Sequence, residues 1–272
     1  GESAGIVSAV GDGVENISVG DRVFAMTGMG AFSEKISAHN SSVVKIPDNM
    51  GFETAAALPM TYGTSLYALK QRANLKAGET LLVLGAAGGV GLATVELGKA
   101  MGARVIAAAS TNEKVDLCIQ HGADEGFIYP SGVLNRDQQK ELSNKIKELS
   151  GGIGPNVIYD PVGGSYSEPC LRSIAWEGRY LVIGFAAGAD QIPKMPLNLT
   201  LLKGCQIVGV FWGAWVGMHP EENKKNFEEL FKLHSEGKIN PEVSDSFTLD
   251  DGALAIAHLK DRKAKGKVII EI

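Results

Sequence analysis

The sequence has few cysteines, no long apolar run and no excess of basic residues. Its three cysteines lie far apart, at Cys118, Cys170 and Cys205, without CxxC spacing, so neither a disulfide framework nor a zinc knuckle is expected. No apolar run is close to the length needed to cross a bilayer, which is about 20 residues. The net charge of -5 gives no basic surface for nucleic acid. We therefore expect a cytoplasmic protein with neither nucleic acid nor membrane as partner.

The sequence contains enough apolar residues to form a sizeable hydrophobic core. The 272 residues are 44% hydrophobic, which fits one large domain or two ordinary ones. The chain opens at Gly1 without a basic or disordered lead and reads at once as a turn feeding a strand. We expect that an N-terminal part of the first domain is missing.

Short β-type runs broken by Gly and Asp dominate the chain up to about Pro59 and predict a small antiparallel unit. The expected strands are Gly5 to Val10, Gly20 to Ala25, Ala31 to Ile36, and Ser42 to Ile46. Near Glu53 the pattern changes to that of a helix.

From Thr80 to Phe211, apolar strands alternate with helical stretches, the pattern of an α/β fold with a doubly wound parallel sheet. Six strands make a full dinucleotide-binding (Rossmann) sheet. The expected strands are Thr80 to Gly85, Arg104 to Ala109, Glu125 to Tyr129, Asn156 to Asp160, Arg179 to Gly184, and Gln206 to Phe211.

After the sheet, Pro220 is suited to the first turn of a helix that Gly237 would end. A last strand, Gly266 to Ile272, is expected to return to the first β unit, so that the Rossmann domain interrupts the other domain. The predicted domains are residues 1–62, 63–213 and 214–272.

A glycine turn follows the first strand of the parallel sheet. The run Gly85-Ala86-Ala87-Gly88-Gly89-Val90-Gly91 lies between Leu84 and a helical pattern. A pyrophosphate is held there by free backbone N–H groups and the positive helix end, and side chains at the turn would block its approach. Tight turns also use glycine, but the six-strand setting favours nucleotide binding.

The end of the second strand indicates which nicotinamide cofactor is bound. An NAD enzyme usually carries an acid there to accept the ribose 2′-hydroxyl, and this chain has Ser110 instead, followed by Lys114. A hydroxyl and a cation suit a 2′-phosphate, which an acid would repel. NADPH is therefore the predicted cofactor, although a single lysine also commonly solvates a helix start.

Together these residues resemble the quinone oxidoreductases of the medium-chain dehydrogenase/reductase superfamily. The motifs in family order are Gly5-Ile6-Val7, Val19-Gly20-Asp21-Arg22-Val23, Gly63-Thr64-Ser65, the glycine turn, Asp160-Pro161-Val162-Gly163-Gly164, and Gly266-Lys267-Val268. The resemblance covers essentially the whole chain. It implies that the antiparallel unit is a GroES-like catalytic domain.

The resemblance also implies a set of cofactor-binding residues. Thr64 would approach the nicotinamide, and Gly85, Gly88, Gly89, Val90 and Gly163 would belong to the pyrophosphate turn and its neighbouring loop. Ser110, Lys114 and Tyr129 would surround the 2′-phosphate, while Phe185, Phe211, Trp212 and Gly213 would line the nicotinamide end. Core packing is an alternative role for Phe185, Phe211 and Trp212. No catalytic acid or base can be transferred to this chain.

Two absences make the chain similar to the zinc-free branch. Zinc-dependent members carry a His before the Glu of the opening motif, where this chain has Gly1 before Glu2, and a four-cysteine loop where it has Met26 to Gly30. The implied activity is hydride transfer from NADPH to a quinone or an α,β-unsaturated carbonyl. An enoyl-thioester reductase and a noncatalytic, crystallin-like NADPH-binding protein are the alternatives. The resemblance further implies a homodimer through the strand Gln206 to Phe211.

Overall fold

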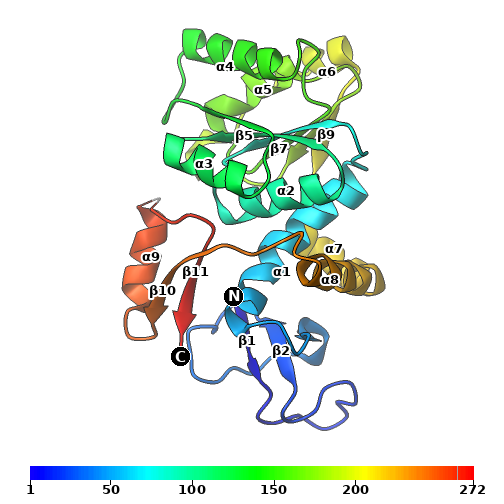
Figure 1. Ribbon diagram of the computed structural model, residues 1–272, viewed down its shortest axis with the longest axis vertical. Helices are drawn as coiled ribbons and strands as arrows, with labels where there is room; N and C mark the ends of the chain where they lie inside the picture. The colour runs from blue at the N-terminus through cyan, green and yellow to red at the C-terminus, as the bar shows by residue number, and fades with distance from the viewer. Residues whose placement is uncertain (262) are drawn as a thin grey trace.

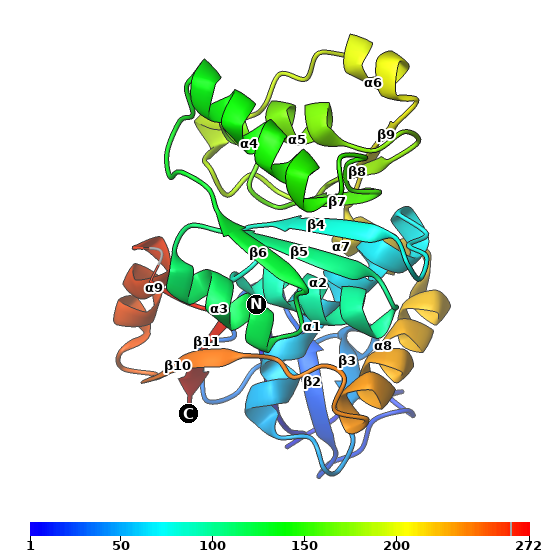
Figure 2. The same ribbon diagram turned by 45° about the horizontal axis from the view of Figure 1, so that its top comes forward.

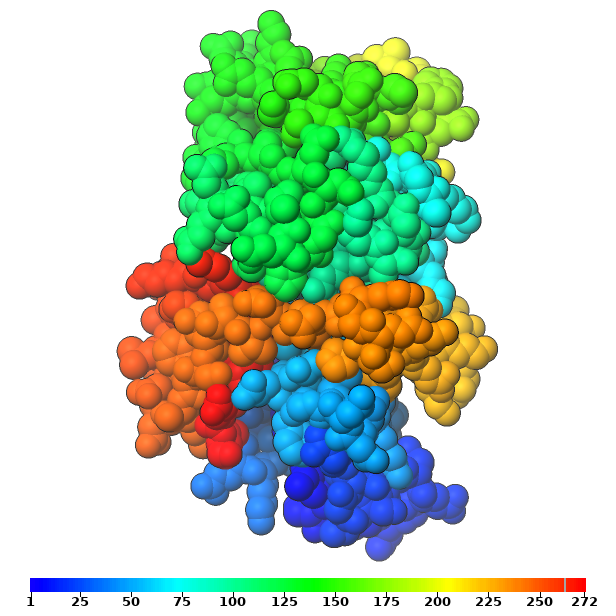
Figure 3. All heavy atoms as spheres, viewed as in Figure 1, coloured from blue at the N-terminus to red at the C-terminus, as the bar shows by residue number. Residues whose placement is uncertain are grey.

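The computed structural model describes residues 1–261 and 263–272. A six-stranded sheet with helices on both faces forms one end of the molecule, and a small β unit that contains the N-terminus forms the other (Figure 1). C-terminal residues form a band across the middle, between the two ends (Figure 3). Within the described residues, no helix has the length and apolar character needed to cross a membrane.

The N-terminal unit is the expected antiparallel sheet, with one predicted strand absent. Its strands are β1 (Glu2–Ile6), β2 (Arg22–Met26) and β3 (Val43–Lys45), with a short 3-10 turn, η1 (Asn40–Ser42), before β3. The strand predicted at Ala31 to Ile36 is wrong, because these residues form bends. The hydroxyl of Ser33 donates to the carbonyls of Gly30 and Lys35 at 2.7 and 3.1 Å, and such local bonds compete with a sheet ladder.

A long helix joins the two ends of the molecule. It is α1 (Phe52–Tyr67), continued by a short π-helical segment, η2 (Ala68–Arg72). Its apolar and small residues are almost all buried against the sheet, the C-terminal helices and β1. The predicted domain limit at residue 62 falls inside α1 and remains a prediction.

The large sheet is confirmed strand by strand and is wholly parallel. Its strands are β4 (Thr80–Leu84), β5 (Arg104–Ala109), β6 (Glu125–Ile128), β7 (Val157–Asp160), β8 (Arg179–Val182) and β9 (Gln206–Gly209). Their order is β6-β5-β4-β7-β8-β9, which is that of a Rossmann sheet with its topological switch between β4 and β7. Each observed strand lies within one or two residues of its predicted ends.

Helices cover both faces of this sheet (Figure 2). On one face lie α4 (Arg136–Leu149), α5 (Ser167–Ser173) and α6 (Asn198–Lys203), with the 3-10 turns η3 (Gly164–Tyr166) and η4 (Ala189–Gln191) nearby in the chain. On the other face lie α2 (Gly89–Ala100), α3 (Asn112–Gln120) and the end of α1. The central strands are fully buried between these layers, as a parallel sheet requires.

The C-terminal region returns toward the N-terminal unit. It comprises α7 (Trp212–Met218), α8 (Pro220–Ser235), β10 (Val243–Thr248), α9 (Gly252–Lys260) and β11 (Lys267–Glu271). The helix predicted from Pro220 is confirmed. Among the described residues, however, β11 pairs only with β10, in parallel, so the return does not extend the first sheet. Its link to β1 is an ion pair, Lys267 Nζ to Glu2 Oε2 at 2.5 Å.

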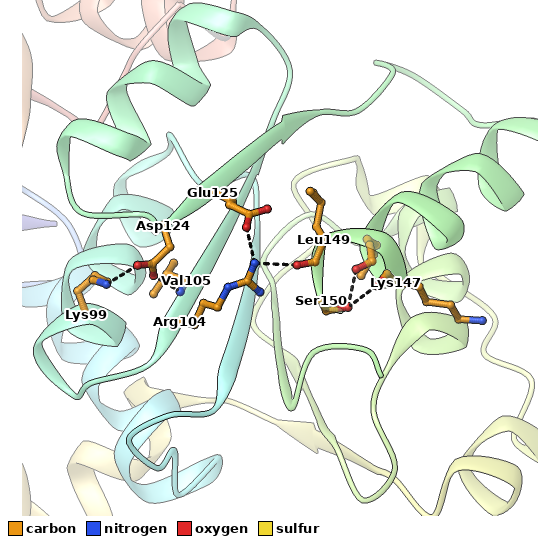
Figure 4. A network of polar contacts seen from close by, with 9 residues as sticks. Lys99, Arg104, Val105, Asp124, Glu125, Lys147, Leu149 and Ser150 are labelled. Carbon is orange, nitrogen blue, oxygen red and sulfur yellow. Dashed lines mark hydrogen bonds and ion pairs between the residues drawn. The ribbon is translucent and has the colours of Figure 1, made fainter. Parts of the chain in front are cut away.

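Ion pairs cross the amino ends of the parallel strands. Arg104, the first residue of β5, donates to Glu125 at the start of β6 and to the carbonyl of Leu149 at the end of α4, at 2.5 and 2.8 Å (Figure 4). Nearby, Lys99 pairs with Asp124 at 2.7 Å. These contacts tie the sheet to both helix layers at one edge.

Candidate functional site

The glycine turn lies at the carboxyl ends of the parallel strands, where β4 ends and α2 begins. Gly85 adopts a φ of 56°, which favours glycine, and its carbonyl accepts the N–H of Gly88 at 3.0 Å. A Cβ on Gly91 would lie 2.4 Å from the Gly85 oxygen and 2.6 Å from that of Ala86. The turn and the helix start are therefore packed so closely that a side chain at residue 91 has no room.

The start of α2 carries no capping side chain. Gly88 caps it without a side chain, and its first turn contains no acid. The first N–H groups of a helix have no partner within the helix, and its dipole is positive there. The carbonyl of Val90 is anchored instead by the hydroxyls of Ser65 and Thr94, at 3.1 and 2.7 Å. Gly88, Gly89 and Val90 therefore form a helix start without a side-chain cap or an acid, and their role in phosphate binding stays a prediction.

Two neighbouring loops pack against this turn at the carboxyl ends of β7 and β8. The Cβ position of Gly85 lies 3.0 Å from Val162, and that of Gly163, whose φ is 71°, lies 3.0 Å from the ring of Phe185. Asp160 fixes the first loop, because its Oδ1 accepts the N–H groups of Val162 and Gly163, each at 2.8 Å. The predicted residues Gly85, Gly163 and Phe185 therefore lie in loops that pack against one another at the carboxyl ends of the strands.

Of the predicted 2′-phosphate residues, Ser110 and Lys114 lie at the start of α3, whereas the side chain of Tyr129 lies elsewhere. Ser110 follows β5 directly, and Thr111 caps α3 by accepting the N–H of Lys114 at 3.3 Å. Lys114 and Ser110 are both half-buried. Tyr129 is buried beside Tyr166, with ring centroids 5.0 Å apart. Burial raises the pKa of the Tyr129 phenol, and a contact with the backbone of Gly85 opposes that rise, so its hydroxyl points toward the glycine turn.

The residues predicted at the nicotinamide end divide into two kinds. Thr64 is the one half-buried residue in the otherwise buried stretch 61–69 of α1 and η2. Trp212 is 3% exposed, and its ring packs so closely on Gly63 that a Cβ there would lie 2.5 Å away. Its Nε1 donates to Asn223 at 3.2 Å. The Trp212 side chain is therefore part of the core, and only its backbone remains available to a ligand.

Phe185 and Phe211, by contrast, are exposed and border a groove of about 600 Å³ beyond the ends of β8 and β9. Tyr67 and Trp215 form another wall, stacked with ring centroids 4.6 Å apart. Gly213 follows at the first turn of α7. The groove is mainly apolar and aromatic, which suits a flat, poorly hydrated molecule.

Comparisons with known proteins agree with this geometry. A family model described as zinc-binding dehydrogenase matches residues 89–234, and one described as alcohol dehydrogenase GroES-like domain matches residues 1–48. The chain is 38% identical to a quinone oxidoreductase-like protein 2 homolog of Nematostella vectensis, over 99% of this chain and 72% of that protein. The chain belongs to the quinone oxidoreductase-like group of the medium-chain dehydrogenase/reductase superfamily.

Solved structures give the same result. A mycobacterial protein in complex with NADPH matches with a TM-score of 0.90 and 32% identity, over 100% of this chain and 81% of that one. The Escherichia coli quinone oxidoreductase, also in complex with NADPH, matches with a TM-score of 0.86 and 29% identity, over 99% and 81%. The predicted family, the Rossmann and GroES-like architecture and the oxidoreductase class are confirmed.

The superfamily contains zinc enzymes, so the metal-binding groups of this quinone oxidoreductase-like chain are relevant. In residues 1–261 and 263–272, no group of three or more His, Cys, Asp and Glu side chains could hold a metal ion. The three cysteines are buried and unpaired. Burial raises the pKa of the Cys118 thiol to about 12, which makes it a poor nucleophile or ligand.

Two charged residues of the site were not found from the sequence. Glu2 accepts the backbone N–H of Met60 at 2.6 Å and pairs with Lys267 at 2.5 Å, which joins β1, α1 and β11 beside the glycine turn. The Lys267 chain lies 3.4 Å from the Cβ position of Gly89. Glu2 and Lys267 are 265 residues apart, and only the folded topology reveals their contact. Both residues stand in motifs that carried the family resemblance, which was the only available signal.

Proposed function

We propose that this chain reduces a quinone or an α,β-unsaturated carbonyl with NADPH and without zinc. The observation that carries the proposal is the start of α2 at the glycine turn, which has neither a capping side chain nor an acid, followed at the next strand end by Ser110 and Lys114 in place of an acid. This combination suits a dinucleotide with a 2′-phosphate.

The residues present fit NADPH. Gly88, Gly89 and Val90 would bind the pyrophosphate through the helix start, where a side chain on Gly91 has no room. Ser110 and Lys114 would hold the 2′-phosphate, with Tyr129 closing the adenosine end against the glycine turn. Thr64, on α1, and the backbone at Trp212 and Gly213 would orient the nicotinamide. When bound, the cofactor supplies a hydride.

The acceptor proposed for the apolar groove is a conjugated carbonyl. Tyr67, Phe185, Phe211 and Trp215 line a groove suited to a planar molecule. The residue before Glu2 is Gly1 and the segment Met26 to Gly30 has no cysteine, which supports a site without zinc. With no metal to polarise a simple ketone, an acceptor that delocalises negative charge is the easier substrate.

A parallel titration with NADPH and NADH tests the cofactor, with energy transfer from tryptophan as the signal. We expect tighter binding of NADPH and an about tenfold selective loss in Lys114→Ala, the size of a charge-assisted hydrogen bond. Equal affinity for both nucleotides in the unaltered chain contradicts the proposal.

Turnover separates the proposed acceptor from the alternatives. Oxidation of NADPH by a panel of quinones and enones supports it. Activity confined to enoyl thioesters supports an enoyl-thioester reductase, and NADPH binding without turnover of any acceptor supports a crystallin-like role. We place the activity in the cytoplasm, where the three unpaired thiols would stay reduced.

We further propose a homodimer through β9. This strand is one of the two outer strands of the sheet, and an unpaired strand edge is a template for a second copy. Leu201 and Leu202 nearby are 81% and 65% exposed. Sedimentation should give twice the chain mass, and Leu201→Glu should shift it toward the monomer. A monomer in the unaltered chain contradicts this assembly.

A further inference from the structure

The C-terminal segment that leads into β11 crosses the glycine turn. The N–H of Gly266 donates to the carbonyl of Ala87 at 3.1 Å, and Gly266 forms a β-bridge with Gly88. Gly266 has a φ of 73°, and a Cβ there would lie 2.5 Å from the carbonyl oxygen of Glu242. The segment is therefore held in one place between the turn and the residues before β10.

Lysines on either side of Gly266 reach different parts of the candidate nucleotide site. Lys267 extends past the start of α2 to Glu2. Lys265 forms an ion pair with Glu113, in the first turn of α3. Since Ser110 and Lys114 flank that turn, the Nζ of Lys265 lies beside the place proposed for the 2′-phosphate. The C-terminal segment thus contacts both the glycine turn and the first turn of α3 from outside the Rossmann sheet.

The ion pair between Lys265 and Glu113 is largely exposed and therefore weak. Glu113 is 74% exposed, whereas Lys265 is 34% exposed. The hydrogen bond from Lys265 lowers the pKa of the Glu113 carboxyl, with a further lowering from Lys114, so Glu113 is ionised near neutral pH. An ion pair this exposed adds little stability. A phosphate carries more negative charge and more acceptor oxygens than a carboxylate, so it competes well for the same ammonium group.

We propose that Lys265 is a specificity residue for NADPH, which exchanges its ion pair with Glu113 for the cofactor's 2′-phosphate. Glu113 holds the lysine in place in the free protein and must release it before the phosphate can bind. The exchange couples the C-terminal segment to the Rossmann domain when NADPH binds, and NADH gives no such coupling. The inference rests on the proposed NADPH-binding function and adds a residue from the other side of the cleft.

Four variants test the exchange through dissociation constants for NADPH and NADH. Lys265→Gln should weaken NADPH binding about tenfold, and Glu113→Gln should strengthen it about threefold, with NADH unchanged in both. Lys263→Gln and Asp116→Asn are the matched controls. Lys263 lies in the same segment and pairs with Asp261 at 3.1 Å, and Asp116 is an exposed acid one turn along α3. Both controls should leave the NADPH to NADH ratio within about twofold.

The double variant Glu113→Gln/Lys265→Gln separates exchange from simple repulsion. If Glu113 acts by occupying Lys265, its removal brings no gain once Lys265 is gone. A gain that persists in the double variant overturns the exchange. An unchanged NADPH to NADH ratio in Lys265→Gln, or an equal loss in Lys263→Gln, overturns the role of Lys265. These results differ from failure of the proposed function, in which the unaltered chain itself has no preference for NADPH.

Discussion

The two ends of the parallel strands differ in the chemical groups that make contacts there. The amino ends and the carboxyl ends of the six strands are here called the amino edge and the carboxyl edge of the sheet. At the amino edge, charged side chains bridge neighbouring elements, as Arg104 does in Figure 4 and as Arg179 does with Glu79 at 2.6 Å. At the carboxyl ends, the strands lead into glycine turns that pack closely on neighbouring side chains, with Gly85 against Val162 and Gly163 against the ring of Phe185.

The difference suggests that the two ends of the strands contribute to different properties, the amino ends to stability and the carboxyl ends to ligand binding. Side chains that pair with each other at the amino edge have no free capacity for a ligand. The carboxyl ends of the strands lead into glycine turns and a helix start without a capping side chain, and open α/β sheets bind their ligands at these ends. We therefore expect changes at the first edge to alter unfolding and changes at the second to alter nucleotide affinity.

The largest effect is expected for Gly91→Ala, which inserts a methyl group into the glycine turn. The Cβ would lie 2.4 Å from the Gly85 oxygen and 2.7 Å from the Ala86 carbonyl carbon, so backbone has to move. NADPH affinity should fall more than about thirtyfold, and the free energy of unfolding by about 2 kcal/mol. Fluorescence titration and thermal unfolding measure the two quantities.

Gly217→Ala is the matched control, since it adds the same methyl group to a helix, α7, with nothing within 4 Å of its Cβ position. It should leave NADPH affinity unchanged and should not lower the free energy of unfolding, because alanine is the better helix former. If Gly91→Ala binds NADPH as the unaltered chain does, the close packing of the turn has no role in binding.

An intermediate effect is expected for Arg179→Gln at the amino edge. Arg179 and Glu79 are 14% and 20% exposed, and Arg179 also donates to the carbonyl of Ala73 at 2.9 Å. Removing one partner of a largely buried pair should lower the free energy of unfolding by about 2 kcal/mol, with nucleotide affinity unchanged. Arg172→Gln breaks the exposed pair with Glu168 and should cost about 0.5 kcal/mol or less. Equal losses in the two variants would contradict this ranking.

The parallel sheet and its turn could be predicted because the information is local. Each strand is a short apolar run, and the run from Gly85 to Gly91 directly follows one of them. The buried strand pattern survives in any context that covers both faces of the sheet. Residues after a strand end, such as Ser110 and Lys114, are placed by the same logic.

The remaining parts depend on contacts that sequence spacing does not show. The strand β10 was not predicted, because Val243–Thr248 is polar and only half-buried and is a strand through its pairing with β11. The supposed strand at Ala31 to Ile36 failed where Ser33 bonds to nearby carbonyls. Contacts between Glu2 and Lys267, or Glu113 and Lys265, join distant segments and require the three-dimensional fold.

The smallest effect concerns charges that belong to neither edge but join the Rossmann domain to the C-terminal region. His121, at the end of α3, lies 2.7 Å from Glu96 Oε1 of α2 and 3.4 Å from Glu242 Oε2, just before β10. Glu96 is 5% exposed and also accepts the hydroxyl of Tyr62 at 2.6 Å and the N–H of Asn240 at 2.9 Å. Burial and the adjacent Glu96 raise the pKa of the Tyr62 phenol, so it stays a neutral donor.

The hydrogen bond to Glu96 raises the pKa of His121 above 6.5, with burial opposing it and the charges of Glu96 and Glu242 adding to the rise. A raised pKa in the folded state means that the folded protein keeps a proton that the unfolded chain releases. The stabilisation is therefore complete below pH 6.5 and is lost as the pH rises through the folded-state pKa.

We expect His121→Gln to remove this pH dependence, with a loss of about 1 kcal/mol that is largest at the acidic end of the window. Chemical denaturation from pH 6 to pH 9 measures it, and His219→Gln, which alters an exposed histidine 3.9 Å from Glu222, should keep the profile of the unaltered chain. If His121→Gln retains that profile, a group other than His121 is responsible for the pH dependence of stability.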